Sequence, residues 1–318
     1  SGLSNEEIII SDTMIAASLI NTLDENITEN IDDSIVKNVS GDASDTYATH
    51  ASSGITGLGN EEIIISDTII AASLLNTLDE NTTGNIDALN LDALTGNGAD
   101  ALTAFNSIGI TELNFDENRY LASHQDLLAA FGSNITAARD HYFEFGISEG
   151  RSFNSFDANS YLASNIDLLA VFGSNTTSAI SHYINYGFEE GRSLDSFNEY
   201  SYIASHTDLL DIYGVNDNAA ATAHYVREGY AEGKAVDTFD EYGYIASYGD
   251  LISTFGTDTM SATKHYISFG KSEGRSTNLF DAKTYLNNNR DLRNIFRNDF
   301  DAAKKHFIEY GFNEGRII

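Results

Sequence analysis

The chain has 318 residues, 48 of them acidic and 17 basic, which gives a formal net charge of -31, and it contains no cysteine, tryptophan or proline. The lack of cysteine excludes disulfides, thiolate nucleophiles and cysteine-ligated zinc or iron–sulfur sites. The negative charge repels phosphate backbones and disfavours nucleic acid as a partner.

With 42% hydrophobic and 11% aromatic residues, the chain has enough apolar material for a packed core. No apolar run reaches the 18 to 20 residues or so that a membrane helix needs, so we expect no membrane span. The first residues, SGLSNEEIII, lack the basic and then apolar regions of a signal peptide. We therefore expect any export signal to lie elsewhere, and the sequence to be part of a longer array.

Residues 1–114 contain two copies of a 55-residue sequence. The segment GLSNEEIIISDTMIAASLINTLDENITENID, which starts at Gly2, returns without a gap from Gly57 as GLGNEEIIISDTIIAASLLNTLDENTTGNID. In the second copy, the β-branched run at 62–67 and the apolar run at 86–94 predict strands, and the spacing of apolar residues at 69–78 and 99–105 predicts helices. Neither half of a copy can bury its own apolar face, so the pattern indicates a short α/β solenoid-like block.

This block carries most of the charge. Residues 1–114 hold 19 acidic side chains and a single basic one, Lys37. Such a density destabilises a compact fold by self-repulsion, which salt or divalent cations relieve.

The turn after the first predicted helix of the second copy suggests calcium. Asp79, Asn81, Thr83 and Asp87 place oxygen ligands along a loop with Gly84 at its sixth position, as in the first half of an EF-hand loop. The twelfth position is Asn90 instead of glutamate, and the alternative is a plain polar turn between a helix and a strand. Calcium is the one cofactor that the sequence suggests.

Residues 115–318 follow a second period, of 41 residues. The repeats start at Phe115, Phe156, Phe197, Phe239 and Phe280, with one additional residue in the third, near Asn216–Asn218. Each predicts two helices. The first is capped by Asp116 or its counterparts Asp157, Asn198, Asp240 and Asp281 and ends at Gly132. The second is capped by Ser133 or Asn134 and ends at Gly146, a stop that tolerates positive φ.

Ala138, Tyr142 and Phe145 are expected on the buried side of the second helix, and so are the counterparts of Tyr142. The whole chain is therefore predicted to be an α+β repeat protein, an α/β block followed by an all-α array of helical hairpins.

Charged residues and histidines recur in the helical repeats at fixed positions. They are Asp126, Asp167, Asp208, Asp250 and Asp291; His141, His182, His224, His265 and His306; Glu149, Glu190, Glu232, Glu273 and Glu314; and Arg151, Arg192, Arg275 and Arg316, with Lys234 in the third repeat. Such a set can form a metal site or a general base with its orienting group. An active site is normally built once, so five copies favour a polar network between helices, in which the arginines pair with the carboxylates.

The landmarks Asp-Leu, His-Tyr and Glu-Gly-Arg of the 41-residue repeat resemble helical repeats of large secreted and surface proteins of bacteria, which also flank some bacterial glycosyltransferases. GITGLGNEEIIISDT and AASLLNTLD of the 55-residue copy resemble arrays in giant surface proteins of aquatic bacteria. The resemblance implies an exported cell-surface protein such as an S-layer subunit, an adhesin or a component of an extracellular filament.

Three functions follow from this reading. The leading hypothesis is a non-enzymatic structural or interaction protein that associates with itself through its repeat faces, with cations assisting. The first alternative is a module that binds a glycan or a protein on the concave face of the helical array. The second is an enzyme that acts through the repeated His and Asp residues.

Overall fold

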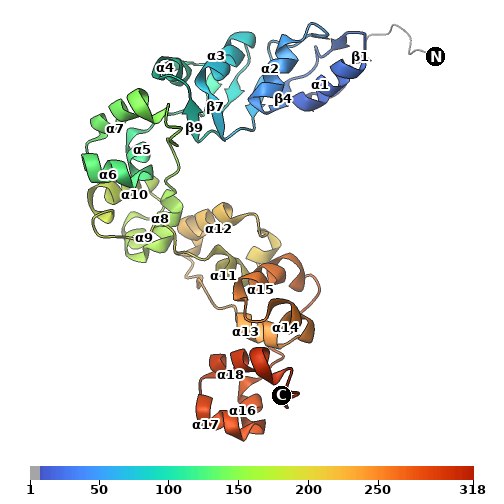
Figure 1. Cartoon of the computed structure of the whole chain (residues 1–318), viewed down its shortest axis with the longest axis vertical. Helices are drawn as coiled ribbons and strands as arrows, with labels where there is room; N and C mark the ends of the chain where they lie inside the picture. Colours follow the sequence, from blue (N-terminus) through green and yellow to red (C-terminus); the bar gives the residue numbers. More distant parts are fainter. Residues whose placement is uncertain (1–7) are drawn as a thin grey trace, which may run out of the picture. The chain divides into compact units, whose positions relative to one another are not determined.

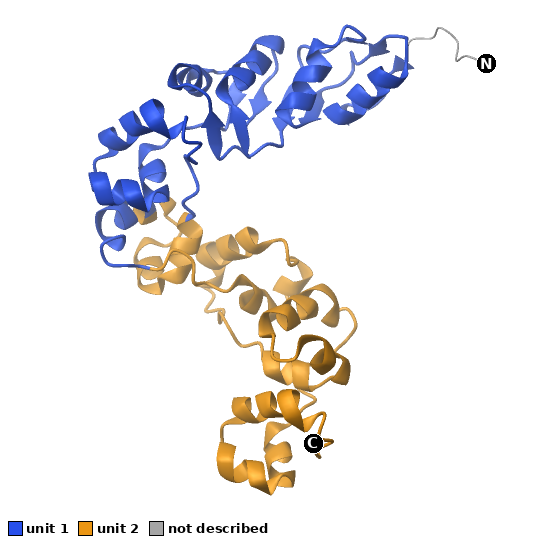
Figure 2. Cartoon of the chain, viewed as in Figure 1, with its two compact units in different colours: residues 1–157, 180–192 blue, residues 158–179, 193–318 orange. Residues whose placement is uncertain are grey.

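The computed structural model describes residues 8–318 and separates them into two compact units (Figure 2). Residues up to 157, together with 180–192, form compact unit 1, and residues 158–179 and 193–318 form compact unit 2. Figure 1 shows the short strands confined to the N-terminal block and helices throughout the rest of the chain. The predicted fold class, an α/β block followed by helical repeats, is confirmed.

The first 55-residue copy, residues 2–56, forms β1 (Ile8–Ile9), β2 (Met14–Ala16), α1 (Ala17–Asn26), β3 (Ile31–Asp32), β4 (Asn38–Gly41), α2 (Ala43–Ala51) and β5 (Ile55–Thr56). The second copy, residues 57–111, forms β6 (Glu62–Ile65), β7 (Ile69–Ala71), α3 (Ala72–Asn81), β8 (Ile86–Asp87), β9 (Ala93–Thr95), α4 (Gly98–Asn106) and β10 (Ile110–Thr111). Each copy therefore places its elements in the same order.

Two boundaries predicted for the second copy are wrong. The segment 69–78 begins as strand β7, and helix α3 starts only at Ala72. The segment 86–94 is two strands instead of one, because the Asp87 carboxylate accepts a hydrogen bond from the Leu89 N–H at 3.0 Å and turns the backbone between them.

All strand pairs are parallel, and the partners lie 23 or 24 residues apart, as in Met14 with Asn38 and Asn38 with Glu62. The 55-residue copy thus consists of two solenoid turns of about 24 residues and a short connection. Each turn contributes two strands and one helix, and neighbouring helices pack along the block, α1 on α2, α2 on α3 and α3 on α4.

Because of the connection between the copies, a sheet does not coincide with a copy. Two strands of the first copy and three of the second form a five-stranded sheet in the order β10-β8-β6-β4-β2, while β1-β3-β5 and β7-β9 form separate sheets. Ile15, Ile20, Ile31 and Val39 fill the core of the first copy, and their counterparts Ile70, Leu75, Ile86 and Leu94 are buried in the second.

The helical repeats contain three short helices and a π-helical segment each, except that a 3-10 turn replaces the second helix in the third repeat. The first repeat has α5 (Glu117–Ser123), α6 (Gln125–Phe131), α7 (Ile135–His141) and η1 (Tyr142–Gly146), and the second has α8 (Ala158–Ser164), α9 (Ile166–Phe172), α10 (Thr176–His182) and η2 (Tyr183–Gly187). The third has α11 (Glu199–Ala204), η3 (Leu209–Asp211), α12 (Asn218–His224) and η4 (Tyr225–Gly229).

The fourth repeat has α13 (Glu241–Ala246), α14 (Gly249–Phe255), α15 (Thr259–His265) and η5 (Tyr266–Gly270), and the fifth has α16 (Ala282–Asn288), α17 (Arg290–Phe296), α18 (Phe300–His306) and η6 (Phe307–Gly311). Neighbouring repeats pack the first helix of one on the last helix or π-helical segment of the next, as α11 on α15 and α13 on α18 in compact unit 2.

The predicted helical hairpins are present, but the first helix of each is not continuous, because one residue breaks it. In the first repeat this residue is His124, whose backbone is extended and whose Nε2 lies 2.7 Å from the carbonyl oxygen of Ser152. Asn165 and Asn289 do the same with Ser193 and Ile317. The side chain at the break thus binds the end of its own repeat and links that end to the first helices.

The predicted N-caps are confirmed where a capping bond is present. Asp116, Asn198, Asp240 and Asp281 accept backbone N–H groups of the following helix, and Asn134 caps α7. Helix α6 ends at Gly132 as predicted, with φ of 57°.

The π-helical segment ends at Gly146 as predicted, but this glycine does not have the expected positive φ. Positive φ occurs four residues later, at Gly150, with φ of 67°. A Cβ at Gly146 would lie 2.6 Å from the hydroxyl of Tyr120, and the equivalent glycines of the third to fifth repeats face the same tyrosine contact. Glycine is therefore needed here for space. Phe145, predicted to be buried, is 53% exposed, because the π-helical segment rotates it off the buried side.

Arg297 stands where Gly132, Gly173 and Gly256 end the equivalent helices, and it keeps a positive φ of 55°. A side chain in this conformation is strained, so Arg297→Gly is expected to stabilise the fifth repeat by about 1 kcal/mol after the entropy cost of glycine. Hydrogen exchange of peptides from α16 to η6 measures the change. Arg293→Gly, an exposed position inside α17, is the control and should destabilise by about 1 kcal/mol. Equal effects of the two substitutions would contradict the strain.

Candidate functional site

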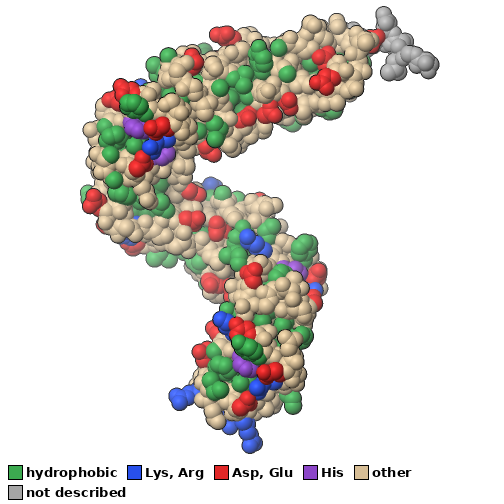
Figure 3. Space-filling view, in the orientation of Figure 1, with side chains coloured by type: hydrophobic (Ala, Val, Ile, Leu, Met, Phe, Trp, Pro, Cys, Tyr) green, Lys and Arg blue, Asp and Glu red, His purple; other side chains and the backbone are tan. Residues whose placement is uncertain are grey.

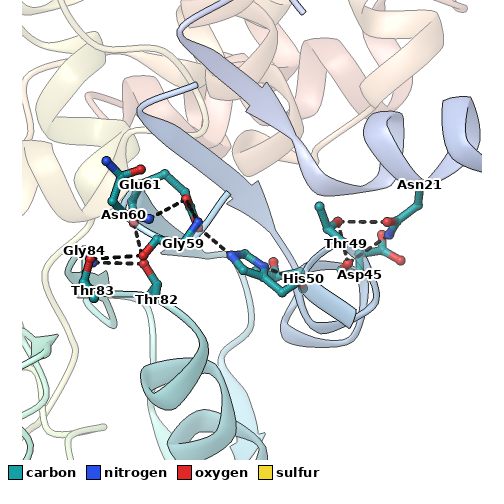
Figure 4. A network of polar contacts seen from close by, with 11 residues as sticks. Asn21, Asp45, Thr49, His50, Gly59, Asn60, Glu61, Thr82, Thr83 and Gly84 are labelled. Atoms are coloured by element: carbon teal, nitrogen blue, oxygen red, sulfur yellow. Dashed lines mark hydrogen bonds and ion pairs between the residues drawn. The ribbon is translucent and has the colours of Figure 1, made fainter. Parts of the chain in front are cut away.

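The junction between the two 55-residue copies contains a buried ion pair. His50, at the end of α2, places Nε2 2.5 Å from Oε1 of Glu61, and both side chains are almost fully buried. The Glu61 carboxylate also accepts the backbone N–H groups of Gly59 and Asn60, and Thr82 donates to the Glu61 carbonyl oxygen (Figure 4). The pair therefore fixes the connection between the copies.

His50 is held in its charged form. Its Nδ1 lies 2.8 Å from the carbonyl oxygen of Thr46, so both ring nitrogens face acceptors and both need a proton. Burial alone would lower the pKa of His50, but the bonds to Glu61 and Thr46 raise it. Burial alone would raise the pKa of Glu61, but the hydrogen bonds from His50 and Gly59 outweigh it and lower this pKa to about 2. The pair thus stabilises the junction fully between the ordinary pKa values of Glu61 and His50, 4.5 and 6.5.

The second copy has phenylalanine at the position of His50. Phe105 lies in the last turn of α4, and its ring lies 5.7 Å from Phe115, 6.2 Å from Phe143 and 5.6 Å from Phe153, centroid to centroid. This aromatic cluster joins the block to the first helical repeat within compact unit 1. The residue at this position in each copy therefore suits the part of the chain that follows. It is a histidine where another copy follows and a phenylalanine where the helical repeats follow.

The four predicted calcium ligands each lie at a different contact. Asp79 accepts the Ser107 hydroxyl at 2.6 Å, Thr83 donates to the Gly59 carbonyl oxygen at 3.0 Å, and Asp87 accepts the Leu89 N–H. Asn81 is the last residue of α3. Among residues 8–318, no group of three His, Cys, Asp or Glu side chains is arranged to hold a metal ion. Calcium therefore stays a prediction for this turn.

In the first, third, fourth and fifth helical repeats the repeated histidine is paired with a tyrosine from the first helix of its repeat. Tyr120 Oη lies 2.9 Å from Nδ1 of His141, and the same contact joins Tyr202 to His224, Tyr244 to His265 and Tyr285 to His306. Burial raises the pKa of Tyr285 to about 12, so its hydroxyl keeps its proton. A hydroxyl that donates to Nδ1 leaves the proton of the neutral ring on Nε2.

The repeated basic residue pairs with both carboxylates of its own repeat. Arg151 lies 2.8 Å from Asp126 and 2.5 Å from Glu149, and its hydrogen bonds lower the pKa values of both acids. Arg275 with Asp250 and Glu273, and Arg316 with Asp291 and Glu314, repeat this pattern. Lys234 takes the same place, at 2.7 Å from Asp208 and 3.9 Å from Glu232, and Arg192 pairs with Glu190. Asp167 lies at the equivalent position in the first turn of α9, and His182 ends α10.

These contacts close each repeat on itself. The basic residue follows a left-handed glycine such as Gly150 and reaches back to the start of the second helix. Figure 3 shows histidines beside basic and acidic side chains on the surface of the first and last helical repeats. In this arrangement the acidic and basic side chains neutralise each other and the histidine rings are held in place. An exposed ion pair of this kind adds only about 0 to 1 kcal/mol to the stability of the fold.

The sequence reasoning missed two sets of residues. The tyrosine partners recur at a fixed phase, at 120, 161, 202, 244 and 285, but the sequence does not distinguish such a tyrosine from one that only packs in the core. The helix-breaking position, at 124, 165, 206, 248 and 289, changes among His, Asn and Tyr and so escapes a search for one residue type. What its side chains share is a hydrogen-bonding group with enough reach.

A third feature is a set of exposed aromatic rings on the π-helical segments. Phe145 and Tyr186 in compact unit 1, and Phe269 and Tyr310 in compact unit 2, are 53–61% exposed. Phe145, Phe269 and Tyr310 each pack one side on the histidine of their repeat, at 5.5 to 5.7 Å between centroids. In the third repeat Glu228 takes this position, 3.8 Å from His224.

Comparisons with protein-family models, with curated proteins and with solved structures found no match to this chain. None of the helices between residues 8 and 318 has the length and apolar character needed to cross a bilayer.

Asp33 is the least satisfied charged group of the junction. It is fully buried, and neither carboxylate oxygen has a hydrogen-bond partner. Burial raises its pKa to about 6, and the nearby carboxylates of Asp32 and Glu61 add to the rise. The second copy has the buried Ala88 at this position.

Asp33→Ala is therefore expected to stabilise the block at pH 7.5, by about 2 kcal/mol. Since the pKa in the folded chain lies above the ordinary value of 3.8, the penalty grows as the pH rises from 4 to 6 and is absent below. The gain should therefore shrink toward pH 4 in urea unfolding followed by circular dichroism. Asp32→Ala is the control and should destabilise, because Asp32 accepts the Ser34 N–H at 2.9 Å. A gain that does not depend on pH would contradict an ionised Asp33.

Proposed function

We propose that the chain is a non-enzymatic structural and interaction protein of the bacterial cell surface. It is a segment of an S-layer, an adhesin or an extracellular filament, and it associates with itself through its repeat faces. The observation that carries this proposal is the use of the repeated polar groups. His141, Arg151 and their equivalents bind partners inside their own repeats, so the groups with catalytic chemistry serve the fold.

The charge supports a role for cations in this association. Residues 1–114 contain 19 acidic side chains and a single lysine, and two surfaces with such a charge repel each other at low ionic strength. Divalent cations bind carboxylate oxygens and relieve this repulsion at lower concentrations than monovalent salt. Calcium between carboxylates of neighbouring chains is therefore part of the proposal.

The test is the mass of the full chain in solution, measured by light scattering together with small-angle scattering. We expect masses above that of the monomer that grow with protein concentration and with calcium. Sodium chloride at matched ionic strength separates specific binding from screening, and a chelator reverses the calcium effect. A monomer at every concentration, with or without calcium, would refute self-association.

A glycan- or protein-binding module is the second candidate, favoured by the exposed aromatic rings. A ring that is more than half exposed and held on a histidine presents a rigid apolar face, which suits the apolar face of a sugar ring. Because the ring position is kept in four of five repeats, a polymeric ligand has several contacts to use.

This candidate predicts that Phe145→Ala combined with Tyr186→Ala weakens retention on an insoluble polysaccharide such as chitin, cellulose or peptidoglycan. The loss should be at least tenfold in affinity, since a linked pair of contacts is removed. Thr177→Ala and Ser148→Ala form the control, because they change small side chains of the same repeats. Retention of none of these polysaccharides by the unmodified chain would speak against glycan binding.

A further inference from the structure

The sheets of the N-terminal block follow one rule across the boundary between copies. The five-stranded sheet takes its first two strands, β2 and β4, from the first copy and the other three, β6, β8 and β10, from the second. By the same rule, β1-β3-β5 are the last three strands of such a sheet, because they are the counterparts of β6, β8 and β10. The three-stranded sheet thus corresponds to a five-stranded sheet without its first two strands.

The free side of β1 has the backbone groups that such strands would need. The N–H groups of Ile8 and Ile10 donate to the carbonyl oxygens of Asn30 and Asp32, so the N–H of Ile9 points to the other side of the strand. In β6, Glu62 and Ser66 donate to Lys37 and Gly41, which places the N–H of Ile64, the counterpart of Ile9, toward β4. Within the described chain β1 is paired on one side only.

The side chains around β1 repeat the surface that the second copy uses at the junction. Asp67 accepts the backbone N–H of Ala43 at the start of α2, at 2.7 Å, and its counterpart Asp12 is exposed. Leu19 on α1 is 52% exposed, whereas its counterpart Leu74 is half-buried on α3, the helix that packs on α2 of the first copy. Ile9 is 64% exposed, and Ile64 is half-buried.

The side of a copy that would pair with β1 is its trailing side, which carries β4 and α2 in the first copy. In this chain the trailing sides of both copies are already covered. The second copy covers β4 and α2 of the first through β6 and α3. The first helical repeat covers the second copy, where Phe153 donates its N–H to Asp92 and Asn154 its side-chain amide to Leu91. The partner that fits β1 must therefore bring a copy whose trailing side is free.

We propose that β1, α1 and Asp12 form a docking face for the trailing side of a further 55-residue copy. A strand equivalent to β4 pairs with β1, a helix equivalent to α2 packs on α1, and its first N–H groups bind Asp12. This inference rests on the proposed function, because it names the partner through which a repeat face associates. The established junction, continued by one copy, is the argument for this partner.

The first experiment uses the chain as it is and compares Ile9→Pro with Ile64→Pro. Proline removes the N–H of the side that faces the partner, which a free edge tolerates and a paired strand does not. We expect Ile64→Pro to increase the hydrogen exchange of β4 and β6 at least tenfold, and Ile9→Pro to leave that of β3 within about twofold. An Ile9→Pro variant as damaged as Ile64→Pro would overturn the free face.

The second experiment adds the partner. A chain with residues 2–56 repeated once in front of Gly2 offers a copy with a free trailing side. Exchange of the amides at 8–16 should slow at least tenfold, to the rate of 63–71 in the second copy, and Ile9→Pro should cancel this protection. An added copy that is protected by itself while 8–16 exchange as before overturns the proposal, and so does an added copy that stays unfolded.

The mass of both chains separates this inference from the proposed function. Protection at 8–16 in a strictly monomeric extended chain supports the docking face and counts against association between chains. A dimer of the original chain that Ile9→Pro abolishes would instead make β1 of a second chain the partner, and would overturn the choice of a trailing side.

Discussion

The structure of the N-terminal block depends on hydrogen bonding between residues about 24 positions apart. A strand of two to four residues has no stability by itself, and each turn buries its apolar side only against the next one. This constraint explains why the copies are nearly identical from β1 to α1 and from β6 to α3, and in β3 and β8. A change in one turn alters the surface on which its neighbours are built. It also gives a reason for the absence of proline, since a parallel strand between two others needs N–H groups on both sides.

The helical repeats meet the same requirement with side chains. Their helices are six or seven residues long, too short to be stable alone, and each repeat is closed by contacts from its last residues to its first helices. His124 reaches Ser152, Arg151 reaches Asp126, and Tyr120 reaches His141. The polar residues that look catalytic in the sequence are thus the ones that hold a small fold together.

Sequence periodicity was sufficient to predict the two kinds of repeat, the N-caps and the helix end at Gly132. It could not separate β7 from α3, because Ile69, Ile70 and Ala71 suit a strand edge as well as a first helical turn. It could not show the 24-residue turn, because its residues differ between turns and only the backbone register repeats. The positive φ expected at Gly146 was wrong, since a glycine that is needed for the space near Tyr120 looks in the sequence like one needed for a left-handed helix end.

The exchange of His50 for Phe105 has a consequence for how such a chain can evolve. Tandem copies tend to be made identical by recombination, yet these two must differ at this position. If the second copy were converted to the first, a histidine would enter the cluster around Phe115 and Phe153 and would find no carboxylate equivalent to Glu61 there, since Asp116 binds the helix start at Asn118. If the first were converted to the second, Glu61 would lose its counter-ion. Copy number can therefore change inside the array, while the last copy before the helical repeats stays distinct.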